Sequence, residues 1–521
     1  MQISKINNKL YDENSSKISN IVFANQCLTK KELSMDTNIF EQNVLNAQTK
    51  LAQIVEFIKT NSNNLEAHQM ESKLFEQLQS LGVELMDVYF KSVENNDVGE
   101  SIQNEAGIEL KRHGRKTSNY FSIFGNVAVN RTIYWKKGHD LVVPLAEQCN
   151  LPKSSYSYLV QDMLNSLSVN TPFSESKNYY KKFFNHTIHV RQIEEMTSFV
   201  TEDYDAFYKE KSIPDSSLEG GIQVLSFDGK GVPMIKKEAA KIKARLNKGE
   251  KRQKKKEALV GVSYTIDKNI RTAASIAKNL VYPTDKEDDT ELNEKNRACN
   301  IRRMASVARA KPDVMEEILQ DAIRRNTEQK RETVILIDGM PYLQKQVETQ
   351  INNRISYCLI LDIIHACEYI WLCGNTLYGE KTKECKAFVY KQLKKILEGK
   401  VGRVIGGIKQ IKTKQEIKGN KAETIEKVIK YLTNHKSLMK YDQYLSKGYP
   451  VGTGVVESAC KQVVKQRMEG SGMRWSIDGA ENMLLMRSIK TSNDWDSFQK
   501  FHTVKQKSKL YENYTPLKKA A

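Results

Sequence analysis

The chain has 521 residues, too many for one hydrophobic core, so its length predicts three or four domains. A formal net charge of +18 favours an anionic partner, either nucleic acid or an anionic membrane. No stretch has the 18 or more apolar residues of a membrane span, and the first ten residues lack the apolar core of a signal peptide. We therefore expect a cytoplasmic protein with no membrane partner, acting on nucleic acid.

The N-terminal part of the chain changes its hydrophobic period twice. Residues 1–35 are polar and predict a disordered or irregular lead-in, whereas 36–100 has helical spacing that predicts two helices interrupted at Asn61–Asn64. The segment 118–135 then alternates polar with apolar residues around Phe124-Gly125-Asn126, which predicts a β-hairpin.

Helical spacing returns after the hairpin, in two short amphipathic segments around Phe173–Phe184 and Val190–Val200. With Thr187 as the N-cap of the second segment, the two can form a DNA-binding helix-turn-helix or an ordinary helical pair inside a bundle. The sequence leaves both alternatives open. Together with the hairpin, these helices make 101–215 the expected DNA-binding region.

The segment 216–384 has a mixed α/β pattern. Apolar runs predict strands at 222–227, 258–266, 271–282, 333–337 and 355–362, with a helix at 312–327 and another after the fourth strand. This order is that of an RNase H-like fold. Lys-rich helical sequence at 385–447 then predicts a helical insertion, 448–495 supplies a final helix, and 496–521 is a basic C-terminal tail.

Two aspartates occupy matching places in this pattern. Asp228 and Asp338 each end an apolar strand and precede a glycine, where ligand groups of open α/β sheets collect. Structural turn chemistry is the alternative for either one alone. In an RNase H-like fold, acids on the first and fourth strands lie side by side, and a third comes from a late helix. Three converging carboxylates would bind two Mg²⁺ or Mn²⁺ ions for phosphodiester chemistry.

The late helix begins near Val455 and carries the candidate third acid, Glu457. Its valines form an apolar stripe, and the opposite side carries Glu457, Lys461 and Lys465 at four-residue spacing. One interpretation places Glu457 at the metals and the two lysines on phosphates. The other leaves these residues as exposed ion pairs that support the helix.

Four segments together resemble the DDE transposases of bacterial insertion sequences, most closely the ISKra-type group within the Mutator-like set. They are FDGKGVPM (227–234), LIDGM (336–340), LDIIHACEYIW (361–371) and YPVGTGVVESACKQVVKQRMEGSGMRWS (449–476). The resemblance covers about 105–490. It implies an RNase H-like core with a helical insertion and a catalytic triad at Asp228, Asp338 and Glu457.

The resemblance also assigns a second motif. Asp362-Ile-Ile-His365 matches the Asp-x-x-His of the Mutator-like set, which implies that His365 contacts a phosphate or carries a proton, supported by Asp362. The alternative is an aspartate that caps a helix, with a histidine one turn in. The CxxC that some relatives carry after the hairpin is absent here, so no zinc is expected in the N-terminal region.

Basic residues next to Asp228 predict DNA contacts. The segment 235–256 is a Lys- and Arg-rich run that we expect to contact phosphates without sequence preference, although such runs are often only solvated loops. Arg302, Arg303 and Arg309 are expected to extend this surface. Arg474 and Trp475 either stack on a base or, for Trp475, anchor the core. The candidate DNA-binding residues are Lys230, Lys251, Arg252, Lys254, Lys255, Lys256, Lys461, Lys465, Arg474 and Trp475.

The resemblance implies a DNA transposase that hydrolyses the element ends to expose 3′-OH groups and then joins them to target DNA. Its implied partners are the terminal inverted repeats and target DNA, bound by a homodimer or higher oligomer in the bacterial nucleoid. Two alternatives remain: a DNA-binding regulator derived from a transposase, and an RNase H-fold nuclease that does not join strands.

Overall fold

The computed structural model describes residues 35–94, 99–103, 107–242, 254–283 and 297–511. By its internal contacts the chain divides into two compact units. The first comprises residues 1–160, 184–186 and 507–521, and the second comprises 161–183 and 187–506. The expected irregular lead-in lies outside the described residues except for Met35, and so does 512–521 of the expected basic tail.

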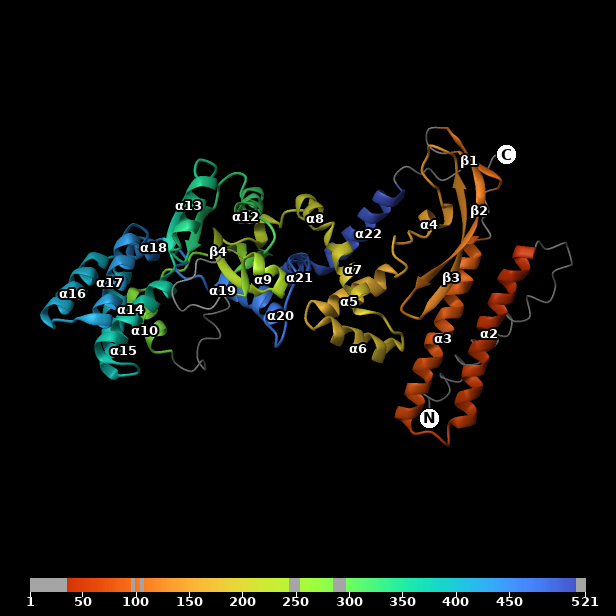
Figure 1. The fold of residues 1–521 in the computed structure, drawn as a ribbon, viewed down its shortest axis with the longest axis horizontal. Coiled ribbons are helices and arrows are strands. Elements are labelled where there is room, and N and C mark those ends of the chain that lie inside the picture. Colours follow the sequence, from red (N-terminus) through yellow and green to blue (C-terminus); the bar gives the residue numbers. More distant parts are fainter. Residues whose placement is uncertain (1–34, 95–98, 104–106, 243–253, 284–296, 512–521) are drawn as a thin grey trace, which may run out of the picture. The chain divides into compact units, whose positions relative to one another are not determined.

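The first unit consists of two long helices and a three-stranded sheet (Figure 1). Helices α2 (Met35–Asn61) and α3 (Ala67–Glu94) lie side by side, joined by the break that the sequence predicts. Strands β2 (Glu109–Phe121) and β3 (Asn126–Trp135) form the predicted hairpin, and β1 (Ser101–Gln103) pairs with β2. The short helix α4 (Pro144–Gln148) follows, and Phe90 of α3 is buried among hairpin and α4 residues.

Three helices follow the hairpin and α4. After α5 (Tyr158–Ser168) come α6 (Phe173–Phe184) and α7 (Val190–Thr201). The N-cap of α7 is His189 rather than the predicted Thr187, because the Gln192 side chain accepts from the His189 backbone N–H at 3.0 Å. Helix α7 buries one face and contacts α21 (Ile477–Thr491). Helix α8 (Tyr204–Glu210) and a 3₁₀ turn at Ser216–Leu218 lead into the sheet.

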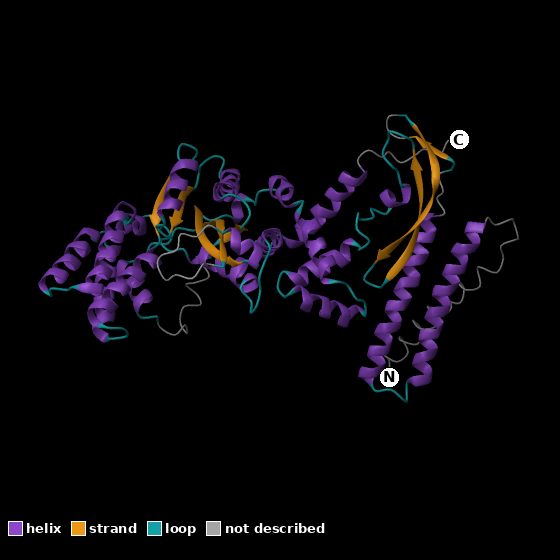
Figure 2. Ribbon diagram, in the orientation of Figure 1, coloured by secondary structure: helices purple, strands orange, loops and turns teal. Residues whose placement is uncertain are grey.

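The second unit contains a mixed five-stranded sheet in the order β6-β5-β4-β7-β8. Figure 2 colours its strands orange among the helices of this unit. Strands β4 (Ile222–Pro233), β5 (Lys255–Ile266) and β6 (Cys299–Ser306) pair antiparallel. Strands β7 (Glu332–Ile337) and β8 (Tyr357–Leu361) continue from β4 in parallel. In chain order the strands therefore read 3-2-1-4-5 across the sheet.

The third predicted strand, 271–282, is wrong. Residues Ala273–Val281 form helix α10, in which Thr272 caps the N-terminus by accepting from the Ser275 N–H at 3.1 Å. Its buried Ala277 and Val281 are four residues apart, which is helical spacing. The third strand is instead β6, whose two adjacent arginines hide its apolar pattern.

Both faces of the sheet are covered because its strands alternate their apolar side chains. Leu225 and Phe227 of β4, with Ile335 of β7, pack against α12 (Lys311–Arg325) and α13 (Pro341–Gln350). Val224 of β4 and Leu336 of β7 face the opposite core, which contains α14 (Ile363–Tyr378) and α21. The result is a helix–sheet–helix arrangement.

The predicted insertion is helical, as expected. It contains α15 (Lys383–Leu397), α16 (Val401–Lys414), α17 (Gly419–Asn434), a 3₁₀ turn at Lys436–Leu438 and α18 (Tyr441–Ser446). Helix α17 packs on α14. The chain then forms α19 (Gly454–Ala459), a π-helical segment at Cys460–Lys465, α20 (Gln466–Met468), α21 and α22 (Trp495–Tyr511). Among the described residues, no helix is both long and apolar enough to cross a membrane.

Candidate active site

Asp228 and Asp338 lie on neighbouring strands. Asp228 does not end its strand as predicted, because β4 continues its pairing with β5 as far as Pro233. The pairing of β4 with β7, however, stops at Ser226. Asp228 therefore lies two residues beyond the part of β4 that pairs with β7, and Asp338 directly follows the last residue of β7. Both side chains are half-buried.

The loop of Asp338 is held by the helical insertion. The Met340 N–H donates to Asp338 Oδ1 at 2.8 Å, and Gly339 has a φ of +87° that favours glycine. The Tyr431 hydroxyl of α17 donates to the Asp338 carbonyl at 3.2 Å, and Nε2 of His435, the residue that caps the C-terminus of α17, donates to the Gly339 carbonyl at 2.8 Å. Sequence reasoning missed this pair, whose only signal is its four-residue spacing on a helix.

Glu457 lies in the first turn of α19, as predicted, and the same helix reaches Asp228. Three residues further on, the Cys460 thiol donates to Asp228 Oδ2 at 3.2 Å. The helix widens to a π-helix at Cys460–Lys465, a feature that often marks functional sites. The buried Arg487 donates from Nε to the Gln462 and Val463 carbonyls in this segment, at 2.9 Å each. The sequence predicts neither the widened turn nor its arginine.

Asp362 is a fully buried carboxylate with all its accepting positions in use. Oδ1 accepts from the backbone N–H groups of Ile364 and Thr453, at 3.0 and 3.1 Å. Oδ2 accepts from the Thr453 hydroxyl at 2.6 Å and from His365 Nδ1 at 2.8 Å. Asp362 therefore caps α14, as the structural alternative predicted. It also fixes the ring of His365 and the Gly-Thr-Gly segment before Glu457.

The charges of these residues influence one another. Burial raises the pKa of Asp338, the Met340 N–H and His365 lower it, and Asp228 raises it again. Burial also raises the pKa of Glu457. A hydrogen bond from the Thr453 hydroxyl lowers this pKa, and the negative charges of Asp362 and Asp228 raise it. The hydrogen bond to Asp362 raises the pKa of His365 to about 9, so its ring is cationic at neutral pH. The charge of Asp228 thus raises the pKa of both Asp338 and Glu457, and the charge of His365 lowers both.

One group of side chains in the described residues could hold a metal ion. Ligand atoms of Asp362, His365 and Glu457 all lie within 4.8 Å of one another, whereas Asp228 and Asp338 are not part of this group. Asp362 is a poor ligand, however, because four donors already occupy its two oxygens. Of the three residues, only Glu457 offers a carboxylate that is not already saturated.

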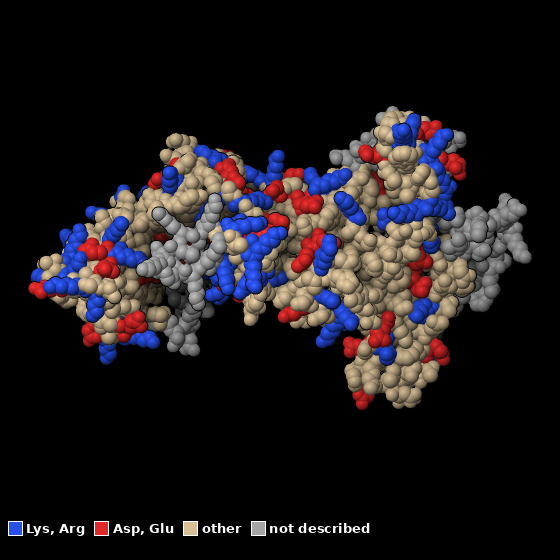
Figure 3. Space-filling view, in the orientation of Figure 1, with Lys and Arg blue, Asp and Glu red and all other residues tan. Residues whose placement is uncertain are grey.

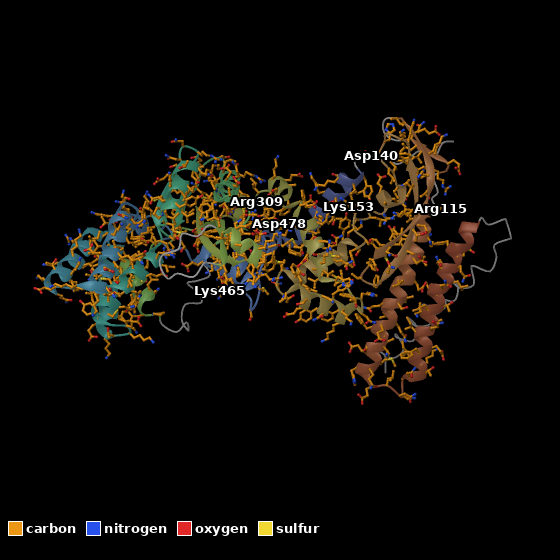
Figure 4. All side chains as sticks on the ribbon, in the orientation of Figure 1. Arg115, Asp140, Lys153, Arg309, Lys465 and Asp478 are labelled. Atoms are coloured by element: carbon orange, nitrogen blue, oxygen red, sulfur yellow. The ribbon has the colours of Figure 1, made fainter. Side chains whose placement is uncertain are left out.

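Several of the predicted DNA-binding residues are exposed near this site. Lys461 and Lys465 extend from the exposed side of the late helix, and Lys465 is labelled in Figure 4. Figure 3 shows Lys and Arg side chains gathered over β4, α9 (Lys236–Lys241) and α20. The exposed lysines of this surface are Lys236, Lys237, Lys241, Lys254, Lys255 and Lys465.

The other predicted basic contacts vary in accessibility. Lys230 and Lys256 are partly buried on β4 and β5, and Lys255 pairs with Glu469 at 2.6 Å. Lys251 and Arg252 lie outside the described residues. Arg474 is exposed. Trp475 is buried, with its Nε1 donating to the Met468 carbonyl at 3.1 Å and Arg467 stacked on its ring, which favours the core-anchor alternative.

Arg302 does not extend the basic surface as expected. Its side chain is 4% exposed, pairs with Glu317 and stacks on the Tyr208 ring. Arg309 also pairs with Glu317, and Arg303 donates to the Thr491 carbonyl. These arginines hold β6 to its neighbouring helices.

Comparisons with known proteins add no family assignment. No protein-family model matches the chain, and a search of curated proteins found no significant match.

Proposed function

We propose that this chain is a DDE-type DNA transposase with an RNase H-like catalytic core. The observation that carries the proposal is the electrostatic coupling of Asp228 to two other acids, each carried by a separate element. Asp228 on β4, Asp338 after β7 and Glu457 on α19 share one electrostatic environment, in which the charge of Asp228 raises the pKa of the other two. The 3-2-1-4-5 strand order and the helical insertion before Glu457 support the same assignment.

The donor set of this acidic site suits magnesium or manganese. Its three carboxylates offer only oxygen ligands, and their mutual repulsion is relieved by bound cations. We propose that Asp228, Asp338 and Glu457 hold two such ions. When bound, the ions would supply charge neutralisation for the attacking and leaving oxygens of a phosphodiester.

The other residues of the site orient the DNA and handle its charge. Asp362 holds His365 by Nδ1, which leaves Nε2 of the cationic ring to donate to a phosphate oxygen or to carry a proton. Lys461 and Lys465 are exposed on the same helix as Glu457 and contact neighbouring phosphates. In this role Asp362 is a positioning residue and His365 a catalytic one.

The proposed reaction has two steps. Water attacks the phosphodiester at each element end and breaks the P–O3′ bond, which leaves a 3′-OH on the element and a 5′-phosphate on the flanking strand. The 3′-OH then attacks a phosphodiester of the target, forms a new P–O3′ bond and displaces the 3′-OH of the cut target strand. No covalent protein intermediate is required, so the residues contribute by positioning and by neutralising charge. The DNA partners are the terminal inverted repeats and the target, and joining two ends requires at least two copies of the chain.

The proposal is tested by incubating the purified protein with labelled element ends, plasmid target and Mg²⁺ or Mn²⁺. We expect joined product from the wild type, and neither cleavage nor joining from Glu457→Gln, with DNA binding retained. The matched control is Glu423→Gln on the exposed side of α17, which should react like the wild type. Cleavage without joining would indicate a nuclease, binding alone a regulator, and unchanged cleavage by Glu457→Gln would refute the assigned acid.

A further inference from the structure

Helices α2 and α3 pack through a regular heptad seam. The less exposed positions alternate in steps of four and three along both helices, as in a coiled coil. The seam residues are Asn43, Ala47, Lys50, Ile54, Phe57 and Asn61 on α2, and Met70, Leu74, Gln77, Leu81, Glu84 and Val88 on α3. This seam accounts for the contact between the two helices.

Each helix also carries a second apolar stripe that the seam does not use. On α2 the stripe contains Leu51, Val55 and Ile58, and on α3 it contains Phe75, Leu78, Leu85 and Tyr89. These seven large side chains are each 38–53% exposed. A stripe with steps of three and four residues is what a helix presents to another helix.

The two stripes lie on one face of the helix pair. In the heptads defined by the seam, both occupy the b and e positions, and the helices are antiparallel because residues 62–66 join them. The e positions of two antiparallel helices flank their seam on the same side. Phe124 at the hairpin turn lies against Gly82, another b position, where an added Cβ would be 2.4 Å from its ring. Phe124 is itself 36% exposed and borders this face.

This apolar face is uncharged and belongs to an acidic part of the chain. From Val44 to Ile58 and from Phe75 to Tyr89, its b and e positions include no Asp, Glu, Lys or Arg. Residues 35–94 contain nine Asp or Glu against four Lys, a net charge of −5 in a chain of +18. In Figure 3 tan surface predominates over these helices. The negative charge of this segment disfavours DNA as the partner, and an uncharged apolar face favours another protein surface.

We propose that the apolar face of α2 and α3 binds the same face of a second copy of this chain, forming a two-fold symmetric four-helix bundle. A helix pair with matched stripes is self-complementary, since a two-fold axis places stripe against stripe. The face is about 20 residues long and two helices wide, which is roughly 30 by 20 Å. Two copies would bury about 1,200 Å² in total, the lower limit of a standard interface.

The test is sedimentation of the full chain without DNA or metal, so it does not depend on the proposed function. We expect a monomer–dimer equilibrium. Leu51→Glu combined with Leu85→Glu should raise the dissociation constant about a hundredfold or more, because each dimer would bury four unpaired carboxylates. Thr49→Glu combined with Ala52→Glu, at exposed positions off the stripe, is the matched control and should leave it unchanged. Thermal unfolding confirms that both variants fold.

Hydrogen exchange of the full chain at low and high concentration identifies any other occupant. We expect protection of residues 44–62 and 72–92 to rise with concentration. A monomer with these segments protected would mean that another segment of the same chain covers the face. A monomer with them unprotected would mean that nothing covers it. Either result, or a dimer that survives the paired glutamates, would overturn the proposal.

Discussion

Asp362 influences the site through His365 rather than through its own oxygens. Its four hydrogen bonds leave it no accepting position for a metal or a substrate. Its charge instead stabilises the protonated imidazole, whose other nitrogen stays available. The Asp-x-x-His spacing therefore combines a helix cap with a cation, and the structural and functional interpretations of the motif are compatible.

This coupling predicts a pH-dependent contribution of His365 to stability. The folded pKa of about 9 is higher than the ordinary value near 6.5, so the contribution is complete below about pH 6.5 and is lost as pH rises through 9. We expect the difference in unfolding free energy between wild type and His365→Gln to shrink by about 3 kcal/mol over that range. Urea unfolding at a series of pH values measures it. A difference that stays constant would show that Asp362 does not hold a cation there.

At the residue scale the sequence singled out the candidate acids but not the residues that contact them. Asp338 and Glu457 stand out by position, after an apolar strand and in a first helical turn. The contacts of Cys460 with Asp228, and of Tyr431 and His435 with the Asp338 loop, join residues about 90 to 230 positions apart. No local pattern encodes such contacts, because the packing of the whole unit brings these residues together.

At the element scale, strands with continuous apolar runs were predicted and strands with buried charge were missed. Strand β7 contains four consecutive apolar residues, Val334 to Ile337, and was predicted. Strand β6 contains Arg302 and Arg303, whose charges are compensated by distant partners such as Glu317 and the Thr491 carbonyl. The apolar sequence of the Ala-rich segment 271–282 predicted the third strand there, but this segment forms helix α10. The sequence predicted only the first half of β4, which is buried between β5 and β7. The second half pairs only with β5, and its sequence lacks a continuous apolar run.

The loop between β7 and α13 should be intolerant of any side chain at Gly339. An added Cβ would lie 2.8 Å from Leu361 and 3.2 Å from both Tyr431 and His435, at a φ of +87°. We expect Gly339→Ala to lower the unfolding free energy by about 2 kcal/mol or more. Gly406→Ala is the matched control, since it lies inside α16 with nothing within 4 Å and should raise stability by up to about 1 kcal/mol.

Chemical denaturation of the two glycine variants tests this account. Opposite changes are expected, and the Gly339 variant should also lose activity if the insertion helix α17 fixes Asp338. Equal changes would show that the loop can move away from α17. A stable but inactive Gly339→Ala would instead separate the geometry of the site from the stability of the fold.

At the scale of the whole molecule, the sequence predicted the sign of the charge but not its distribution. The helical pair α2–α3 is acidic, so all of the net positive charge resides elsewhere in the chain. Part of that charge is neutralised internally, as Arg302 shows. The exposed lysines of α9, next to β4, are available for a polyanion. They belong to the basic segment whose phosphate contacts were predicted from its position beside Asp228.

Salt dependence of DNA binding measures how many of these lysines contact phosphates. Each contact contributes about −0.9 to the slope of log affinity against log salt, so Lys236→Gln, Lys237→Gln and Lys241→Gln together should make the slope shallower by up to about 3. The loss should be equal for any DNA sequence. Replacing Lys59 and Lys73, which are exposed on the acidic helices, is the control and should leave the slope unchanged. A loss confined to terminal-repeat DNA would show that α9 recognises sequence, because contacts to the backbone alone do not distinguish one sequence from another.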